Sequence, residues 1–443
     1  MKENINAHIV DFISSLREKD IPLFPYLYNE NNKSEIKKVY YSGPYWNDDE
    51  IVNMIRAILT GKWISSGENV RKFEVKFSKM FNVKHSLMLN SGSSANLVMM
   101  AALKKRFGWK DDDEIILSAV GFPTTLAPII QNNLKPIFLD IENDTLNFDL
   151  SNIESVITNR TKAIIISPVL GNSPNMDRLI EISEKHNIQL VLDNCDSLGS
   201  KWNDKYLNEF AVASSCSFYP AHHITTGEGG MVSSNDEELI SIARSIAWWG
   251  RDCYCVGAAN LLACGTCGNR FDKWLPGYDG VVDHKYVFTN VGYNLKPLDL
   301  QGAIGLAQLD KFEEIHEKRR INKEIIEKLF IEQFSFVKVP GELNYATTSW
   351  FGVPIICQTK EQKTLLVSHL EGNGIQTRNY FAGNILLHPA YSYLDDYKKY
   401  PNSNKVLDTV FFLGCAPNYT NEIFEYIKEI IKKFENVKSL RVL

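Results

Sequence analysis

The 443-residue sequence contains no long uninterrupted apolar segment. A helix that spans a bilayer needs about 20 consecutive apolar residues, so no membrane-spanning segment is expected. The first twenty residues, MKENINAHIVDFISSLREKD, carry scattered charges and lack the apolar centre of a signal peptide. These absences predict a cytoplasmic protein without a membrane partner.

An excess of basic residues is also absent, because 48 lysines and arginines stand against 53 aspartates and glutamates, for a net charge of −5. No nucleic-acid partner is therefore expected. With 44% hydrophobic and 23% charged residues, the composition excludes a disordered or fibrous chain. One hydrophobic core rarely serves more than about 250–300 residues, so the length predicts two domains.

Cysteine is scarce but unevenly placed, with eight residues in the whole chain. Four of them lie close together, at Cys253, Cys255, Cys264 and Cys267. Three others, Cys216, Cys357 and Cys415, stand in apolar segments and are interpreted as small buried side chains. In a reducing compartment a local group of cysteines is more typical of a metal or catalytic site than of disulfides.

Between about residues 46 and 250, short apolar segments alternate with amphipathic ones, which predicts strands alternating with helices. The predicted strands are His85–Leu89, Glu114–Ser118, Pro136–Leu139, Ala163–Ser167, Gln189–Leu192, Ser214–Phe218 and Gly230–Ser233. The clearest predicted helices are Ser94–Lys104, Asn175–His186 and Glu237–Trp248. The pattern predicts an α/β fold around a mostly parallel seven-stranded sheet.

The remaining sequence suggests how the chain is divided. We expect an N-terminal arm over residues 1–45 and a large domain over 46–300, which includes a non-periodic insertion at 251–297. Residues 301–443 are expected to form a linking helix and a smaller α+β domain. The linking helix is predicted as one continuous element over residues 300–330.

Ligands of open α/β sheets collect beyond the carboxyl ends of the strands. After the strand at His85–Leu89, the residues NSGSSAN begin a helix and include Gly92 and Ser93. Small residues at a helix N-terminus favour the binding of a phosphate. A plain strand-to-helix turn capped by Ser93 is the alternative. After the strand at Gln189–Leu192 comes Asp193, which could hold a protonated ring nitrogen or cap a helix.

The strand at Ser214–Phe218 is followed by YPAHHITTGEGG, and these three features in this order resemble the DegT/DnrJ/StrS sugar aminotransferase family. Further matches are GKWISSG at residues 61–67, the stretch from Leu139-Asp140 to Asn147, and VGYN at residues 291–294. The resemblance implies a fold-type I pyridoxal phosphate (PLP) fold with a large and a small domain.

The sequence departs from that family at the position of the lysine that binds the cofactor. The aminotransferases carry a lysine that binds the cofactor covalently where this chain has His222. Histidine there resembles the 3-dehydratase branch, which binds pyridoxamine phosphate (PMP) without a covalent anchor. An imidazole can still move a proton, because its ordinary pKa is about 6.5, so His222 is the predicted catalytic residue.

The cysteines resemble those of the iron–sulfur members of that branch, the CDP-4-keto-6-deoxyhexose 3-dehydrases. The match implies a 2Fe–2S cluster held by four thiolates, which are Cys195, Cys253, Cys255 and Cys267. Cys264 is the rival fourth ligand, and a zinc site in the same cysteines is the alternative. Because Asp193 and Cys195 lie at most ~7 Å apart along an extended chain, such a cluster would lie on the order of 10 Å from the cofactor ring.

For the remaining site residues the resemblance implies separate roles. Phe122 would stack on the cofactor ring, with a place in the core as the alternative. Ser217 would bind the phosphate together with Gly92 and Ser93, and Asp196 occupies the place of a glutamine that commonly lies over the ring. Asn294 would reach the site of a neighbouring subunit in a homodimer.

The resemblance thus implies removal of the C3 hydroxyl from a CDP-4-keto-6-deoxyhexose for 3,6-dideoxysugar and lipopolysaccharide biosynthesis. An NADH-dependent flavin/iron–sulfur reductase would supply the electrons through the cluster. Two other interpretations remain: a cluster-free PMP-dependent 3-dehydratase acting on another nucleotide sugar, and a non-catalytic sugar-nucleotide sensor.

Overall fold

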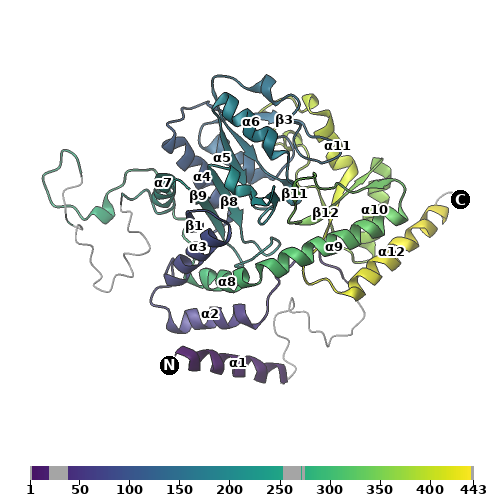
Figure 1. Cartoon of the computed structure of the whole chain (residues 1–443), viewed down its shortest axis with the longest axis horizontal. Coiled ribbons are helices and arrows are strands. Elements are labelled where there is room, and N and C mark those ends of the chain that lie inside the picture. Colours follow the sequence, from purple (N-terminus) through teal and green to yellow (C-terminus); the bar gives the residue numbers. More distant parts are fainter. Residues whose placement is uncertain (1, 19–37, 253–270, 272–274, 441–443) are drawn as a thin grey trace.

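The structure, a computed structural model of the whole chain, describes residues 2–18, 38–252, 271 and 275–440. Its helices are α1 (Lys2–Glu18), α2 (Asp48–Thr60), α3 (Glu68–Met80), α4 (Gly92–Arg106), α5 (Pro123–Gln131), α6 (Met176–His186), α7 (Glu237–Ala247), α8 (Asp299–Asp310), α9 (Phe312–Gln333), α10 (Lys360–Gly372), α11 (Pro401–Thr409) and α12 (Asn421–Leu440). Figure 1 shows them around a central sheet, with α9 and α12 side by side at one end.

The central sheet has seven strands in the order β1-β9-β8-β5-β4-β2-β3. Its strands are β1 (His85–Leu89), β2 (Glu114–Ser118), β3 (Lys135–Leu139), β4 (Thr161–Ile166), β5 (Gln189–Asp193), β8 (Ala213–Ser217) and β9 (Gly230–Ser234). Only β9 runs antiparallel to its neighbours in this sheet. The predicted mostly parallel seven-stranded sheet is confirmed, with boundaries shifted by one or two residues.

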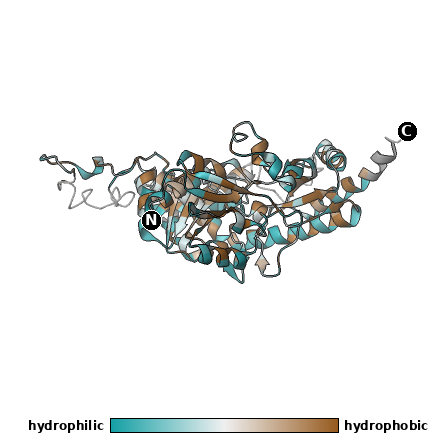
Figure 2. Ribbon diagram, turned by 90° about the horizontal axis from the view of Figure 1, so that it is seen from above, coloured by the Kyte–Doolittle hydropathy of each residue, from teal (hydrophilic) through white to brown (hydrophobic). Residues whose placement is uncertain are grey.

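Helices cover both faces of this sheet, and the alternation of side chains along a strand explains why its strands are apolar throughout. In β2, Ile115 and Leu117 pack into a core that also contains Leu103 of α4 and Ile129 of α5. Ile116, between them, points the other way into a core with Leu179 and Ile182 of α6. Figure 2 shows the hydrophobic residues gathered in the central strands.

A second, four-stranded antiparallel sheet has the order β10-β12-β14-β13. Its strands are β10 (Val337–Lys338), β12 (Gly352–Cys357), β13 (Thr377–Asn379) and β14 (Val410–Gly414). Their apolar residues form one core with α9, α10 and α12, which is the predicted smaller α+β unit. A third sheet of short strands, β11 (Ala346–Thr347), β6 (Lys201–Trp202) and β7 (Lys205–Tyr206), joins residues from either side of the linking helices.

The linking element differs from its prediction, because it is two helices rather than one. Lys311 has φ −105° and ψ 3°, outside the helical range, and separates α8 from α9. The turn lets Leu309, Phe312 and Ile315 enter the same core together with Phe218. Burial of these side chains outweighs the continuous amphipathic pattern that predicted a single helix.

The N-terminal region contains more structure than an arm. Ile9 and Ile13 of α1 are 6% and 2% exposed and pack against Val52 of α2, and α2 and α3 lie against α8. The domain boundaries at residues 45 and 300 remain predictions, as does the cytoplasmic location. In the described part of the chain, no helix has the length and apolar character needed to cross a membrane.

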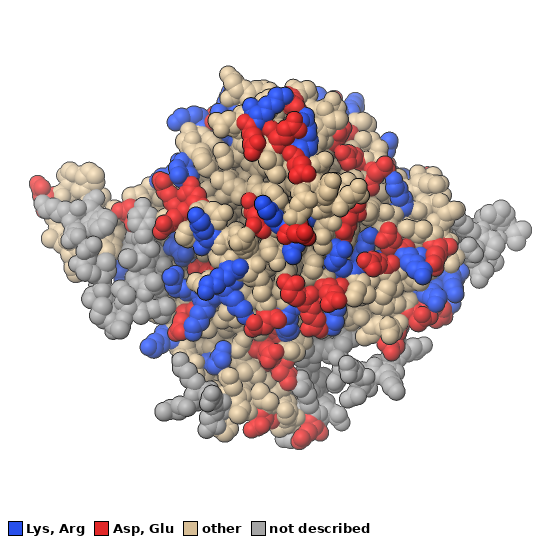
Figure 3. Space-filling view, viewed as in Figure 1, with Lys and Arg blue, Asp and Glu red and all other residues tan. Residues whose placement is uncertain are grey.

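Charge is spread evenly over the visible surface. On the face in Figure 3, lysine and arginine side chains are interspersed with aspartate and glutamate. That distribution fits the small net charge of −5 and offers no uniformly basic surface on this face.

Candidate active site

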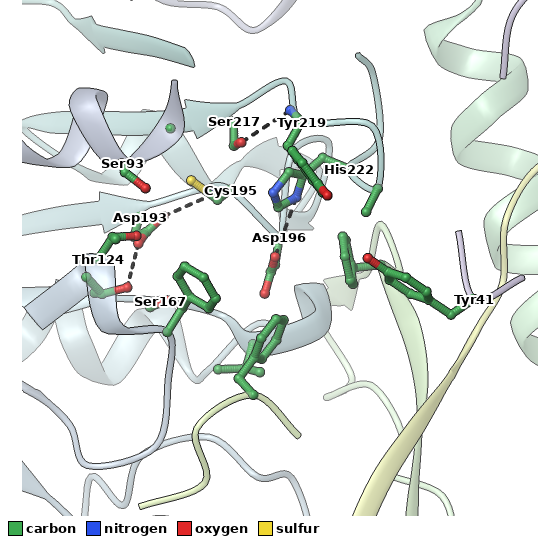
Figure 4. A pocket seen from close by; sticks show the side chains of 17 residues that line it. Tyr41, Ser93, Thr124, Ser167, Asp193, Cys195, Asp196, Ser217, Tyr219 and His222 are labelled. Atoms are coloured by element: carbon green, nitrogen blue, oxygen red, sulfur yellow. Dashed lines mark hydrogen bonds and ion pairs between the residues drawn. The ribbon is translucent and has the colours of Figure 1, made fainter. Parts of the chain in front are cut away.

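A cavity of about 180 Å³ opens beyond the carboxyl ends of β2, β4, β5 and β8. It is lined by Tyr41, Gly92, Ser93, Phe122, Thr124, Thr125, Ser167, Val169, Asp193, Cys195, Asp196, Ser217, Tyr219, Ala221, His222, Phe351 and Phe381. Figure 4 shows these side chains arranged around the cavity, with His222 pointing toward Asp196. Eight predicted site residues, from Gly92 to His222, meet here although they are up to 130 positions apart in the sequence.

Asp193 is the last residue of β5 and is 5% exposed. Its Oδ2 accepts hydrogen bonds from Asn96 Nδ2 at 2.8 Å and Thr125 Oγ1 at 2.6 Å. Its Oδ1 accepts from the Cys195 backbone N–H at 3.2 Å and from Ser215 Oγ at 3.4 Å. Four donors thus fix this carboxylate, and the alternative role as a helix cap is not observed, because no helix begins here.

At the other end of the cavity, the N-terminus of α4 meets the end of β8. Ser91, rather than Ser93, caps α4, since its hydroxyl accepts from the Ser94 backbone N–H at 3.1 Å. Ser93 is left exposed toward the cavity. A Cβ atom on Gly92 would lie 2.4 Å from Ser217 Cβ, so only glycine permits this close approach. The free N–H groups, two hydroxyls and the helix dipole suit a phosphate.

His222 follows β8 on a turn and points toward Asp196, as Figure 4 shows. Its Nδ1 lies 3.6 Å from Asp196 Oδ1 and has no hydrogen-bond partner. Burial, with the positive charge of Arg319, lowers the pKa of His222 to about 4. Burial, with the nearby charge of Asp193, raises the pKa of Asp196 to about 8. At neutral pH the imidazole is therefore uncharged and able to accept a proton, beside a protonated carboxyl.

Aromatic side chains form the rest of the wall. Phe351 lies 5.2 Å from the His222 ring, centroid to centroid, and Phe381 lies 5.9 Å from Phe122. Phe122 is 51% exposed, so it belongs to the cavity wall and not to the core, which was the alternative. An exposed ring face here can stack on a planar ligand.

Cys195 is the one predicted cluster ligand among the described residues, and its thiol lines the cavity. Burial, together with Asp193, raises the pKa of this thiol well above its usual range. Cys253, Cys255 and Cys267, and the rival Cys264, lie outside the described residues. Within the described part of the chain, no three His, Cys, Asp or Glu residues are grouped so as to hold a metal ion. The predicted burial of Cys216, Cys357 and Cys415 is confirmed.

Asn294 does not line the cavity of its own chain. It is exposed, and its backbone pairs with Trp248 at the end of α7. A contribution to the site of a neighbouring subunit therefore remains a prediction.

Sequence reasoning missed several residues that build the site. Asn96 and Thr125 hold Asp193, and Arg319 of α9 donates to the backbone of the His222 turn. Asn96 and Thr125 each stand in the first turns of a helix that follows a strand, which is a signal that could have suggested them. Arg319 and Phe351 come from distant parts of the chain and carry no such local signal.

Comparisons with known proteins agree with this geometry. Residues 46–432 match the DegT/DnrJ/EryC1/StrS aminotransferase family. The chain is 38% identical over 403 residues to the lipopolysaccharide biosynthesis protein RfbH of Salmonella typhimurium, covering 89% of this chain and 90% of that protein. It is 38% identical over 406 residues to dTDP-4-dehydro-2,6-dideoxy-D-glucose 3-dehydratase of Saccharopolyspora spinosa, covering 89% and 86%.

Among solved structures, the chain resembles Escherichia coli GDP-4-keto-6-deoxy-D-mannose 3-dehydratase with bound hydrated PLP. The TM-score is 0.77 at 30% identity, and the match covers 90% of this chain and 100% of that one. The predicted fold-type I PLP fold is thereby confirmed. Fold, cavity and sequence agree that the chain belongs to the DegT/DnrJ/EryC1/StrS aminotransferase family.

Proposed function

We propose that this protein is a PMP-dependent nucleotide-sugar 3-dehydratase whose cofactor is not covalently anchored. The observation that carries the proposal is the presence of His222, with an unpaired Nδ1, in a cavity that no lysine of the described residues lines. This is the cluster-free interpretation of the sequence. The comparisons favour it over the iron–sulfur one, because the names of these relatives specify dTDP and GDP sugars and bound PLP.

The cavity residues fit a pyridoxamine phosphate. Asp193, oriented by four donors, would hold the ring nitrogen in its protonated form. Gly92, Ser93 and Ser217 would bind the phosphate, and Phe122 would stack on the ring. When bound, the cofactor supplies an electron sink for a reaction at the neighbouring sugar carbon.

The protein's own residues then have separate tasks. His222, uncharged at neutral pH, would accept a proton at Nδ1 or Nε2 from the cofactor–sugar pair and return it to the departing C3 hydroxyl. Asp196 would orient the imidazole from 3.6 Å away. The aromatic wall that includes Phe351 and Phe381 would exclude water from the reacting atoms.

The substrate class follows from the relatives, and we infer a nucleoside diphosphate bound to a 4-keto-deoxyhexose. The similarity to the lipopolysaccharide biosynthesis protein RfbH supports a place in deoxysugar formation for a surface polysaccharide.

The test uses purified protein supplied with PMP and, in separate reactions, with GDP-, dTDP- and CDP-4-keto-6-deoxyhexose. We expect loss of the C3 hydroxyl, detected by mass spectrometry of the sugar nucleotide. Borohydride treatment of the PLP-loaded protein, followed by peptide mapping, should leave every lysine unlabelled. Amine transfer without dehydration, or a labelled lysine, would contradict the proposal, and binding without turnover of any sugar would favour the sensor.

A homodimer is part of the proposal. Large apolar side chains are exposed along residues 291–298 and on the neighbouring turn after α2, at Trp63 (48%), Ile64 (77%), Val291 (95%) and Leu298 (45%). A second copy of the chain would cover them and bring Asn294 toward a cavity. Sedimentation of the protein should give the mass of two chains.

A second candidate is the iron–sulfur 3-dehydrase acting on a CDP-4-keto-6-deoxyhexose with an NADH-dependent flavin/iron–sulfur reductase. It is favoured by one observation, the position of the Cys195 thiol in the cavity beside Asp193. With Cys253, Cys255 and Cys267, this thiol would hold a 2Fe–2S cluster. Anaerobically purified protein should then contain iron and sulfide, and Cys195→Ala should lose both. Colourless, iron-free protein that dehydrates the sugar would support the cluster-free proposal instead.

A further inference from the structure

Arg319 is a charged side chain buried without a carboxylate partner. It lies on α9, is 1% exposed, and makes no ion pair with any described acidic residue. Its guanidinium donates instead to four backbone carbonyl oxygens: Nη1 to Trp350 at 3.4 Å and Phe351 at 3.1 Å, and Nη2 to Ala221 at 3.4 Å and His222 at 3.1 Å.

A buried guanidinium without a carboxylate partner lowers the stability of the folded protein. Burying an unpaired charge destabilises a folded protein, and an apolar side chain of similar volume would avoid the penalty. The planar fork of arginine can, however, reach carbonyl groups on two separate segments at once. A lysine, with three donors on one nitrogen, cannot reproduce that geometry.

The two segments lie side by side, and both contribute residues to the lining of the cavity. Ala221 and His222 lie on the turn after β8, whereas Trp350 and Phe351 lead into β12 of the second sheet. A further contact ties the same pair of segments, since His223 Nε2 lies 2.9 Å from the Ser349 carbonyl oxygen. The side chain of Phe351 packs 5.2 Å from the His222 ring. The backbone that carries His222 is thus fixed to the backbone that carries its aromatic neighbour.

We propose that Arg319 is a positioning residue that fixes the His222 turn against the Trp350–Phe351 segment and so sets the place of the imidazole in the cavity. The catalytic consequence rests on the proposed function of His222. The claim that Arg319 ties the two segments together does not rest on that function. The experiment tests the two claims separately.

The first measurement is independent of activity. Hydrogen exchange of the peptides around residues 219–227 and 348–353 is followed by mass spectrometry in the wild type, Arg319→Met and Arg319→Lys. The matched control is Arg320→Met, because Arg320 lies on the same helix and donates to the Thr348 carbonyl at 2.8 Å without contacting the His222 turn. We expect exchange of the 219–227 peptide to be at least about tenfold faster in Arg319→Met than in the control, with Arg319→Lys between them. Because Arg320 itself bonds to Thr348, the 348–353 peptide of Arg319→Met is compared with the wild type.

The second measurement is turnover. Arg319 does not line the cavity, so Arg319→Met should lower kcat by about 100-fold through misplacement of the imidazole and leave KM within about threefold. Arg320→Met should stay within about twofold of wild type. In a His222→Asn background the same Arg319→Met change should have little further effect on kcat, because its target is already absent. If Arg319→Met does not fold, Arg319→Lys undergoes the same two measurements.

The outcomes are distinct. Exchange around residues 219–227 that is no faster than in Arg320→Met, or an Arg319 effect on kcat that is equally large in the His222→Asn background, would overturn the proposal. A wild-type protein that dehydrates no nucleotide sugar would overturn the proposed function alone, because the exchange measurement would still decide whether Arg319 fixes the turn.

Discussion

Asp193 and His222 line two sides of the cavity and are held in place in different ways. On one wall, Asp193 ends a strand of the central sheet, and four donors satisfy its two oxygens. On the other, His222 stands on a turn, and its Nδ1 has no hydrogen-bond partner. The side chain of Asp193 is held directly, whereas His222 is held through its backbone, by Arg319.

The difference fits the two chemical tasks that we propose for Asp193 and His222. A group that keeps a fixed charge beside a ring nitrogen benefits from full hydrogen bonding, because that stabilises one protonation state. A group that takes up and releases a proton needs a free nitrogen and a pKa that permits both states. Fixing the backbone of His222 positions its ring and leaves Nδ1 without a hydrogen-bond partner.

The largest expected effect follows from a change of His222. His222→Asn should lower turnover by about 10²–10⁴-fold, because an amide cannot accept a proton at neutral pH. Binding of PLP, measured by absorbance titration, should change by less than about threefold, since Asp193 and the phosphate turn, not His222, are the proposed partners of the cofactor. His369→Asn is the control, because that ring bonds to the Ile430 carbonyl away from the cavity. Turnover retained by His222→Asn would remove its catalytic role.

The second prediction concerns Asp193. Asp193→Asn should weaken cofactor binding by about 100-fold or more, because removing one partner of a buried charge pair costs about 3–5 kcal/mol of interaction free energy. Asp140→Asn is the matched control. Asp140 also follows a strand and accepts from Ser403, but it does not line the cavity. Equal loss of PLP affinity in both variants would mean that Asp193 acts only on stability.

A third effect concerns the pH dependence of stability and arises from His316 on α9, outside the cavity. Burial, with the charges of Arg320 and Lys201, lowers the pKa of His316 to about 4 from 6.5. His316 of the unfolded chain therefore takes up a proton from about pH 6.5 downward, whereas His316 of the folded chain stays neutral until about pH 4. Protonation of the unfolded chain thus lowers the free energy of unfolding as the pH falls through that range. The loss amounts to about 3 kcal/mol at pH 4. The Tm difference between wild type and His316→Gln should narrow or reverse from pH 7 to pH 4. A constant difference would show that His316 does not contribute to the pH dependence of stability.

The smallest expected effect comes from removing one of the hydrogen bonds that Asp193 accepts. Thr125→Val removes the 2.6 Å bond to Asp193 and should weaken PLP binding by about 10–100-fold, as expected for a hydrogen bond of about 1.5–3 kcal/mol to a charged group. Thr124→Val changes the adjacent cavity residue, which does not bond to Asp193, and should shift affinity by less than about threefold. Similar values for the two variants would mean that the remaining donors suffice.

Much of this site could be predicted from the sequence because its residues follow strands. Gly92, Ser93, Asp193 and Ser217 stand at or just after strand ends, and parallel strands bring such ends to one edge. The split of the linking helix at Lys311 could not be predicted, because the amphipathic pattern continues through it and tertiary burial of Phe312 decides the break. The same holds for Arg319, which looks like one more charged residue of an amphipathic helix.

The sequence by itself determined the fold class and the chemistry available at the strand ends, since strand periodicity and residue type are local properties. The histidine at position 222, after the strand that ends at Ser217, is likewise a property of the sequence. Only the tertiary structure decided which groups surround that histidine, from Asp196 at 3.6 Å to the guanidinium of Arg319. Contacts between residues a hundred positions apart, and the loss of water that shifts their pKa values, exist only once the walls of the cavity have met.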